Sequence, residues 1–168
     1  FVNLPLGFID ESLNSAALRV SMYDLHAGGW LDNVETTQTF TYLGTHSNSD
    51  YIELKDDYNS SDKKGHRVRF SNEFKNGLNL DLSFLKQEYF SNGSWESDVA
   101  DGARKVSRYT PETFGDNFEQ ASLTLSGALS DNIDFTFTSS MFDRHIDYTY
   151  DYTQYVYYYG YDYYAAYV

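Results

Sequence analysis

The stretch Leu78-Asn79-Leu80-Asp81-Leu82-Ser83-Phe84 decides the fold of this 168-residue chain, because its apolar residues occupy every second position. Successive side chains of a β-strand point to opposite faces, whereas a helix would spread these apolar residues around its circumference. The stretch therefore predicts a strand with one apolar face and one polar face.

The preceding segment, Arg67–Phe74, alternates in the same way, with Val68, Phe70 and Phe74 on its apolar side. The two segments are joined by Lys75-Asn76-Gly77, and an Asn-Gly pair supplies the positive φ angles that tight hairpin turns need. The sequence therefore predicts an antiparallel hairpin centred on this turn.

Further segments repeat the alternation, while helical periodicity is poor along the whole chain. These segments are Leu18–Tyr23, Ala121–Leu129 and Ile133–Met141, with a weaker one at Phe1–Leu6. A second tight polar turn, Ser130-Asp131-Asn132, joins two of them. The pattern predicts an all-β fold of antiparallel up-and-down strands with short turns and long loops.

The connections between these strands alternate between long and short. No clear strand occurs from Leu25 to Arg67 or from Phe90 to Phe118, although Gln38–Leu43 and Asp50–Leu54 are expected to extend strands or to form a loop hairpin. Outer-membrane barrels sort their connections in this way, with short turns on the periplasmic side and long loops outside. The sorting favours a segment of a transmembrane β-barrel over a soluble, sugar-binding β-sandwich.

The composition excludes several classes of function. The chain has 25 acidic against 12 basic residues, a net charge of −13, which argues against a nucleic-acid partner because phosphates need a basic surface. It has no Cys, which excludes disulfide scaffolds, Cys-based zinc sites and Cys nucleophiles. No run of apolar residues is long enough for a transmembrane helix. No nucleophile elbow is present, and we expect no enzymatic activity.

Candidate metal ligands are sparse. The 4 His residues stand alone, without the spacing of a metal site, so no metal site and no cofactor are predicted. A calcium ion bound at acidic clusters remains an alternative, because Ca²⁺ prefers carboxylate oxygens. These clusters are Asp10-Glu11, Asp56-Asp57, Asp62, and Asp98 with Asp101.

Aromatic and charged side chains supply the candidate site residues. Aromatic rings form girdles at membrane interfaces, and they can also stack on a ligand at an outer mouth. The candidates for ligand contact in the outer loops are Trp30, Trp95, Tyr157 and Tyr159. Charged residues on the polar sides of the strands are expected to face a barrel lumen, where the arginines would pair with Asp81, Glu73 or Asp134. The alternative is a role in the passage of an anionic ligand. The residues expected to face the lumen are Arg19, Arg67, Arg69, Asp81 and Asp134.

The C-terminal stretch Tyr148–Val168 is of low complexity, since 11 of its 21 residues are Tyr. Tyr148, Tyr150 and Tyr152 alternate with polar residues and predict a strand with one aromatic face. Uncharged Tyr-rich strands also pair edge to edge, so a surface for self-assembly remains an alternative for this stretch.

Several segments resemble the barrel of TonB-dependent outer-membrane receptors. Ala17–Tyr23 (ALRVSMY), followed by Gly28–Asn33 (GGWLDN), is similar to a recurring strand and loop of this family. Val2–Leu6, Phe118–Leu125 and Ile133–Asp151 are similar to further family strands in the same order. By this resemblance, residues 1–147 form a partial receptor-like barrel segment of about six strands. Residues 148–168, a Tyr-rich strand or loop, have no counterpart in the family.

The resemblance implies energised uptake of a scarce ligand, such as an iron–siderophore, haem, vitamin B12 or an oligosaccharide, across the outer membrane of a Gram-negative cell. The implied partners are outer-membrane lipid, a small-molecule or glycan ligand, and the TonB complex, reached through a plug that this chain lacks. Family barrels have ~22 strands, so we expect this chain to be part of a larger barrel. The alternative is an extracellular, self-assembling structural β protein, a fibre or tube in which copies of the chain pair through their sheet edges.

Overall fold

The computed structural model describes residues 1–7, 15–40 and 44–159. Among these residues, no helix is long and apolar enough to cross a membrane. The elements in chain order are β1 (Val2–Pro5), β2 (Ala17–Ala27), β3 (Asp32–Asn33), β4 (Thr37–Phe40), β5 (Gly44–Ser47), a 3-10 turn (Asn48–Asp50), β6 (Ser61–Glu73), β7 (Asn79–Asn92), β8 (Lys105–Val106), β9 (Thr113–Ser130), β10 (Ile133–Thr149) and α1 (Thr153–Tyr158).

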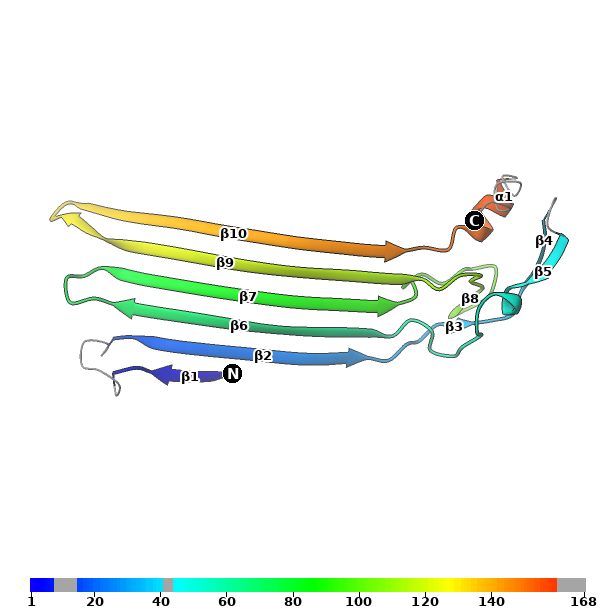
Figure 1. Cartoon of the computed structure of the whole chain (residues 1–168), viewed down its shortest axis with the longest axis horizontal. Helices are drawn as coiled ribbons and strands as arrows, with labels where there is room; N and C mark the ends of the chain where they lie inside the picture. Colours follow the sequence, from blue (N-terminus) through cyan, green and yellow to red (C-terminus); the bar gives the residue numbers. More distant parts are fainter. Residues whose placement is uncertain (8–14, 41–43, 160–168) are drawn as a thin grey trace. The chain divides into compact units, whose positions relative to one another are not determined.

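Six strands form one sheet in the order β1-β2-β6-β7-β9-β10 (Figure 1). Strands of this sheet that follow one another along the chain are also neighbours, so the sheet is an up-and-down meander. The antiparallel pairing of β1 with β2 places Val2 opposite Val20 and Leu4 opposite Leu18. The predicted all-β class and all six predicted strands are therefore confirmed. Five of these strands extend beyond the predicted bounds, because polar and aromatic residues interrupt the apolar alternation at their ends.

Both predicted tight turns are confirmed. The Phe74 N–H donates to the Leu78 carbonyl at 2.7 Å, and the Gly77 N–H donates to the Phe74 carbonyl at 2.9 Å. Gly77 has a φ of 79°, which a residue without a Cβ adopts at no steric cost. The second turn is shorter, since only Asp131 and Asn132 lie between β9, which ends at Ser130, and β10, which begins at Ile133.

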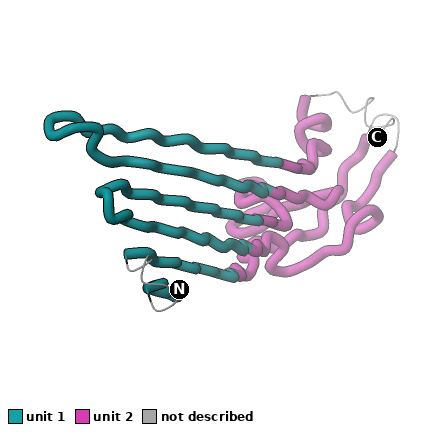
Figure 2. The backbone as a smooth tube through the Cα atoms, turned by 60° about the vertical axis from the view of Figure 1, so that its left-hand side comes forward, with its two compact units in different colours: residues 1–25, 63–88, 116–145 teal, residues 26–62, 89–115, 146–168 magenta. Residues whose placement is uncertain are grey.

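The chain folds into two compact units, which are described separately (Figure 2). Unit 1 contains Phe1–Leu25, Lys63–Glu88 and Asp116–His145. Unit 2 contains His26–Asp62, Tyr89–Gly115 and Ile146–Val168. The described part of unit 1 is therefore mostly strands and the two tight turns, and unit 2 gathers the long connections.

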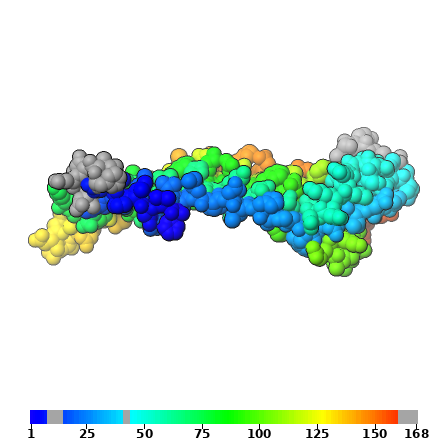
Figure 3. Space-filling model, turned by 90° about the horizontal axis from the view of Figure 1, so that it is seen from below, coloured from blue at the N-terminus to red at the C-terminus, as the bar shows by residue number. Residues whose placement is uncertain are grey.

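Unit 1 is a sheet with both faces open. Among its described residues only Ala16 and Asn72 are buried, and the space-filling view onto β1 and β2 in Figure 3 shows a thin body there. Cross-strand contacts establish which side chains share a face. On one side, which we call the polar face, the Arg69 guanidinium donates to Asp81 Oδ1 at 2.7 Å. The polar face includes Asn3, Arg19, Tyr23, Arg67, Arg69, Asp81, Ser83, Gln87, Asp116, Thr124, Asp134, Thr136, Thr138 and Arg144, together with the packed rings of Phe118 and Phe142.

One contact on the polar face crosses a whole strand. The Tyr23 hydroxyl of β2 donates to Gln87 Oε1 of β7 at 2.7 Å, although β6 lies between these strands. The ring passes over Gly65 of β6, where a Cβ atom would lie 2.5 Å from the ring. A side chain at this position would displace the Tyr23 ring from its place over β6, so glycine permits the contact between β2 and β7.

The opposite side of the same strands, which we call the apolar face, carries large exposed apolar side chains, as the alternation predicts. Met22, Phe137 and Met141 are 75%, 54% and 70% exposed, respectively. The members of the apolar face are Val2, Leu4, Leu18, Val20, Met22, Val68, Phe70, Leu78, Leu80, Leu82, Phe84, Leu123, Leu125, Ile133, Phe135, Phe137 and Met141.

A charged row follows the apolar residues on the same face. Lys64 Nζ lies 3.7 Å from Asp24 Oδ2, and Lys86 Nζ lies 2.9 Å from Glu119 Oε1. Next to Lys86 and Glu119, Asp143 and His145 line the same shallow hollow. The charged row consists of Asp24, Lys64, Lys86, Glu119, Asp143 and His145.

Two expectations for the irregular segments are wrong. Asp50–Leu54 forms no strand: its first residue is the last of the 3-10 turn Asn48–Asp50, which the Ser47 and Asp50 side chains cap as a capping box. The predicted loop hairpin instead joins β4 to β5, with Thr37 opposite Ser47. The predicted aromatic strand ends at Thr149, and α1 follows at Thr153. Residues 160–168 lie outside the described residues.

Candidate functional site

Unit 2 is built around a small core that joins the two long connections. β3 and β8 pair in parallel, with Asp32 opposite Lys105. Leu31, which precedes β3, and Val106 of β8 are 0% and 1% exposed and pack with Tyr58. The first long connection is therefore anchored to the second, although the two are far apart in the sequence.

Buried asparagines provide hydrogen bonds that regular secondary structure would otherwise supply. Asn59 Oδ1 accepts from the backbone N–H groups of Trp30 and Leu31, at 2.8 Å each. Asn33 Oδ1 accepts from the Arg108 N–H at 2.7 Å. Asn48 Oδ1 accepts from the Thr36 N–H at 2.9 Å. These amides satisfy loop backbone groups that burial has removed from water.

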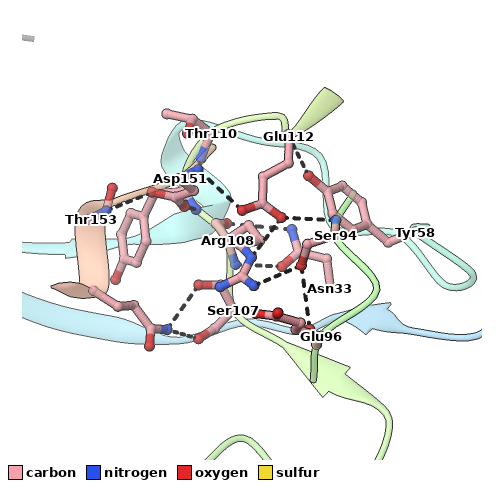
Figure 4. Close-up of polar contacts among 12 residues, drawn as sticks. Asn33, Tyr58, Ser94, Glu96, Ser107, Arg108, Thr110, Glu112, Asp151 and Thr153 are labelled. Carbon is pink, nitrogen blue, oxygen red and sulfur yellow. Dashed lines mark hydrogen bonds and ion pairs between the residues drawn. The ribbon is translucent and has the colours of Figure 1, made fainter. Parts of the chain in front are cut away.

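An ion pair lies beside this core (Figure 4). Arg108 Nε donates to Glu112 Oε2 at 3.0 Å, and the two side chains are only 15% and 4% exposed. The same guanidinium donates to Ser94 Oγ at 3.2 Å, and the Ser94 N–H donates to Glu112 Oε2 at 3.2 Å. The Glu112 N–H donates to the hydroxyl of Tyr58 at 2.9 Å. Burial raises the pKa of Tyr58 above its usual value, so this phenol stays neutral.

Asp151 ties the C-terminal part of unit 2 to the same ion pair. Its carboxylate accepts from the backbone N–H groups of Tyr109, of Thr110 at 3.2 Å and of Thr153 at 2.8 Å. Its own N–H donates to Glu112 Oε1 at 3.2 Å. Asp151 thereby closes a network in which each charged group is bonded by the backbone or by an opposite charge.

A groove of about 580 Å³ lies over this network, entirely within unit 2. Its lining combines aromatic rings with the ion pair and two further carboxylates. The lining residues include Tyr89, Ser94, Trp95, Glu96, Arg108, Glu112, Phe114, Tyr150, Asp151 and Tyr152. A concave surface with apolar walls and a few polar groups is the usual form of a small-molecule site.

The predicted ligand-contact residues do not gather at one place. Trp95 lines the groove and is 49% exposed. Trp30 packs instead against the core of Leu31, Tyr58 and Val106. The Tyr157 ring contacts Phe40, and the Tyr159 ring contacts Tyr155 at 4.6 Å between centroids.

The residues expected to face a lumen lie on the polar face of unit 1. Of the expected pairings, Arg69 with Asp81 is present. Arg19 donates instead to Asn3 Oδ1 at 2.6 Å, and Arg67 donates to Ser83 Oγ at 3.3 Å. Asp134 is exposed at the start of β10.

Arg108, Glu112 and Asp151 were not among the residues predicted from the sequence. Arg108 and Glu112 stand four positions apart in an irregular segment, and Asp151 lies among tyrosines, so no periodic pattern marks any of them. Their proximity depends on the pairing of distant loops.

Metal binding finds no support in the part of the chain that the structure describes, where no group of three or more His, Asp or Glu could hold an ion. Asp62 is hydrogen-bonded to His26 at 2.8 Å. Asp10 and Glu11 lie outside the described residues.

Tyr109 should give the protein a measurable alkaline instability. Burial, with a contribution from the Asp151 charge, raises the pKa of Tyr109 to about 12 from 10.0. Its contribution to stability is complete below pH 10 and is lost as the pH rises toward 12, because the unfolded state releases the proton first. Between pH 10 and pH 12, the free energy of unfolding should fall by about 2–3 kcal/mol less for Tyr109→Phe than for the unmodified protein. Urea unfolding at both ends of the range measures this, and equal losses would contradict it.

The chain was also compared with known proteins. No family model, no curated protein and no solved structure matches it.

Proposed function

We propose that this chain is part of the wall and outer loops of a TonB-dependent receptor barrel in a Gram-negative outer membrane. In this role it serves the energised uptake of a scarce ligand. The observation that carries the proposal is the apolar face of unit 1, whose large side chains are exposed on strand after strand. Exposed apolar surface of this extent marks a contact with lipid or with another apolar surface.

The height of the apolar face fits a bilayer. At about 3.4 Å per residue, the apolar rows span roughly 20 Å from Leu78 to Phe84 and roughly 27 Å from Ile133 to Met141. The apolar band of outer-membrane barrels is about 25 Å tall. The charged row then lies at the level of the lipid headgroups, where ion pairs such as Lys86 with Glu119 are solvated.

The polar face supports the assignment of a water-filled lumen. It carries Arg69 paired with Asp81 and Arg144 paired with Asp116, both through bonds of 2.7 Å. Charged side chains that alternate with apolar ones along the same strands are the pattern of a barrel with lipid outside and water inside. The resemblance noted above supplies the receptor family, with movement of its plug as the energised step.

The orientation can be tested by single-cysteine labelling, since the chain has no native Cys. In intact Gram-negative cells, Asp56→Cys and Val99→Cys, at exposed positions in the long connections, should react with a membrane-impermeant maleimide. The matched turn variants, Lys75→Cys and Asp131→Cys, should react only after the outer membrane is permeabilised, because short turns face the periplasm. The opposite pattern would show that the long connections face the periplasm. Equal labelling of all four variants would contradict the membrane proposal.

A second candidate function is structural self-assembly, which one observation favours. Among the described strands, β10 pairs only with β9 and β1 only with β2, so both sheet edges have free backbone groups. Open edges promote pairing with another chain. Recovery of the protein as extracellular fibres with cross-β spacings of about 4.7 and 10 Å would support this candidate.

A further inference from the structure

The groove of unit 2 is walled by aromatic rings. They come from β7 (Tyr89), the loop after it (Trp95), the start of β9 (Phe114) and the chain after β10 (Tyr150 and Tyr152). Tyr89 and Phe114 are packed together, with ring centroids 6.0 Å apart. Trp95, Tyr150 and Tyr152 are 49%, 44% and 61% exposed, so their rings are available to a ligand. The volume of about 580 Å³ suits a small organic molecule.

The charge of the lining is negative. One guanidinium, Arg108, faces three carboxylates, those of Glu96, Glu112 and Asp151. Arg108 is already engaged by Glu112 and Ser94. Asp151 is held by backbone N–H groups. Among the described residues, the exposed Glu96 carboxylate makes neither a hydrogen bond nor an ion pair, and it remains available to a cation.

We infer that this groove binds an organic cation, such as a substituted ammonium group carried on a small organic body. The faces of aromatic rings are electron-rich and attract cations, most strongly for Trp. The free Glu96 carboxylate adds a Coulomb attraction, and the net charge of −13 raises the local concentration of cations around the protein. An anion would find no unpaired cationic group in the lining, and a neutral sugar would use only ring stacking and hydrogen bonds.

The inference concerns unit 2 alone. It does not depend on the membrane proposal, because the groove is complete within the loops whether or not the sheet of unit 1 lies in lipid. The cysteine labelling therefore tests only the membrane proposal, and the binding titration tests only the proposed groove ligand.

The direct test is a fluorescence titration of the full chain, in which Trp95 reports on the groove. The probes are choline, its uncharged carbon isostere 3,3-dimethyl-1-butanol, maltose and inorganic phosphate. Choline should bind, and the isostere should bind roughly three- to tenfold more weakly, because it has the same shape without the charge. Equal affinity for choline and the isostere, preferred binding of maltose or phosphate, or no binding of choline at millimolar concentration would each overturn the inference.

Two variants locate the site. Glu96→Gln preserves size and should weaken choline binding about two- to fivefold, and Trp95→Ala should weaken it about fivefold or more. Calorimetry replaces fluorescence as the readout for the Trp95 variant. The matched controls, Glu53→Gln and Tyr158→Ala, change exposed residues of unit 2 outside the groove and should leave the affinity unchanged. Circular dichroism confirms that each variant is folded. A Glu96→Gln protein that binds choline as tightly as the unmodified chain would contradict the site.

Discussion

Arg108→Met is expected to lower the free energy of unfolding by about 3–5 kcal/mol, because it leaves the buried Glu112 carboxylate without its cation. Glu112 is 4% exposed, so water from the groove can replace the guanidinium only in part. The nearby Asp151 carboxylate adds like-charge repulsion once Arg108 is absent. Urea unfolding followed by tryptophan fluorescence measures the loss, since Trp30 and Trp95 both lie in unit 2.

The matched control is Arg69→Met, which breaks an exposed ion pair of similar geometry with Asp81 and should cost about 1 kcal/mol or less. A double variant, Arg108→Met with Glu112→Gln, should recover part of the loss, because a neutral amide needs no cation and its single carbonyl oxygen can still accept from either the Ser94 or the Asp151 N–H group. Equal costs for Arg108→Met and Arg69→Met would show that burial of the first pair is unimportant.

Leu125→Arg is expected to cost about 2–4 kcal/mol when the protein is folded in phospholipid vesicles, because the new charge would lie near the middle of the bilayer. Leu125 is on the apolar face, whereas Thr124, its neighbour along β9, faces the opposite side and lies 3.2 Å from Thr138 through their hydroxyl oxygens. Thr124→Arg adds the same charge on the polar face and should cost far less.

The difference between these two variants isolates the lipid contribution. Without lipid, Leu125→Arg and Thr124→Arg should differ little, because both faces of the described sheet in unit 1 are open to water. Unfolding by urea, in vesicles and in buffer, provides the comparison. If the two variants had the same free energy of unfolding in vesicles, the result would contradict a contact between the apolar face and lipid.

The regular part of this protein could be predicted from the sequence because its signals are local. Alternation through Leu78–Phe84 determines which side chains share a face, and Asn76-Gly77 determines where the chain reverses. Neighbouring strands joined by tight turns then pair without further information. The same local rule failed at Tyr150 and Tyr152, where alternation was present but α1 follows at Thr153.

Only the tertiary structure could reveal the groove and the network beneath it. Arg108 and Glu112 come from one long connection, Tyr58 comes from the other, and Asp151 follows β10. None of these residues belongs to a periodic pattern in the sequence. They meet because buried amides such as Asn33 and Asn59 hold irregular backbone segments together across large sequence separations. Alternation of apolar and polar residues is a property of one strand and is visible in the sequence, whereas the convergence of loops depends on contacts between distant segments that no local pattern records.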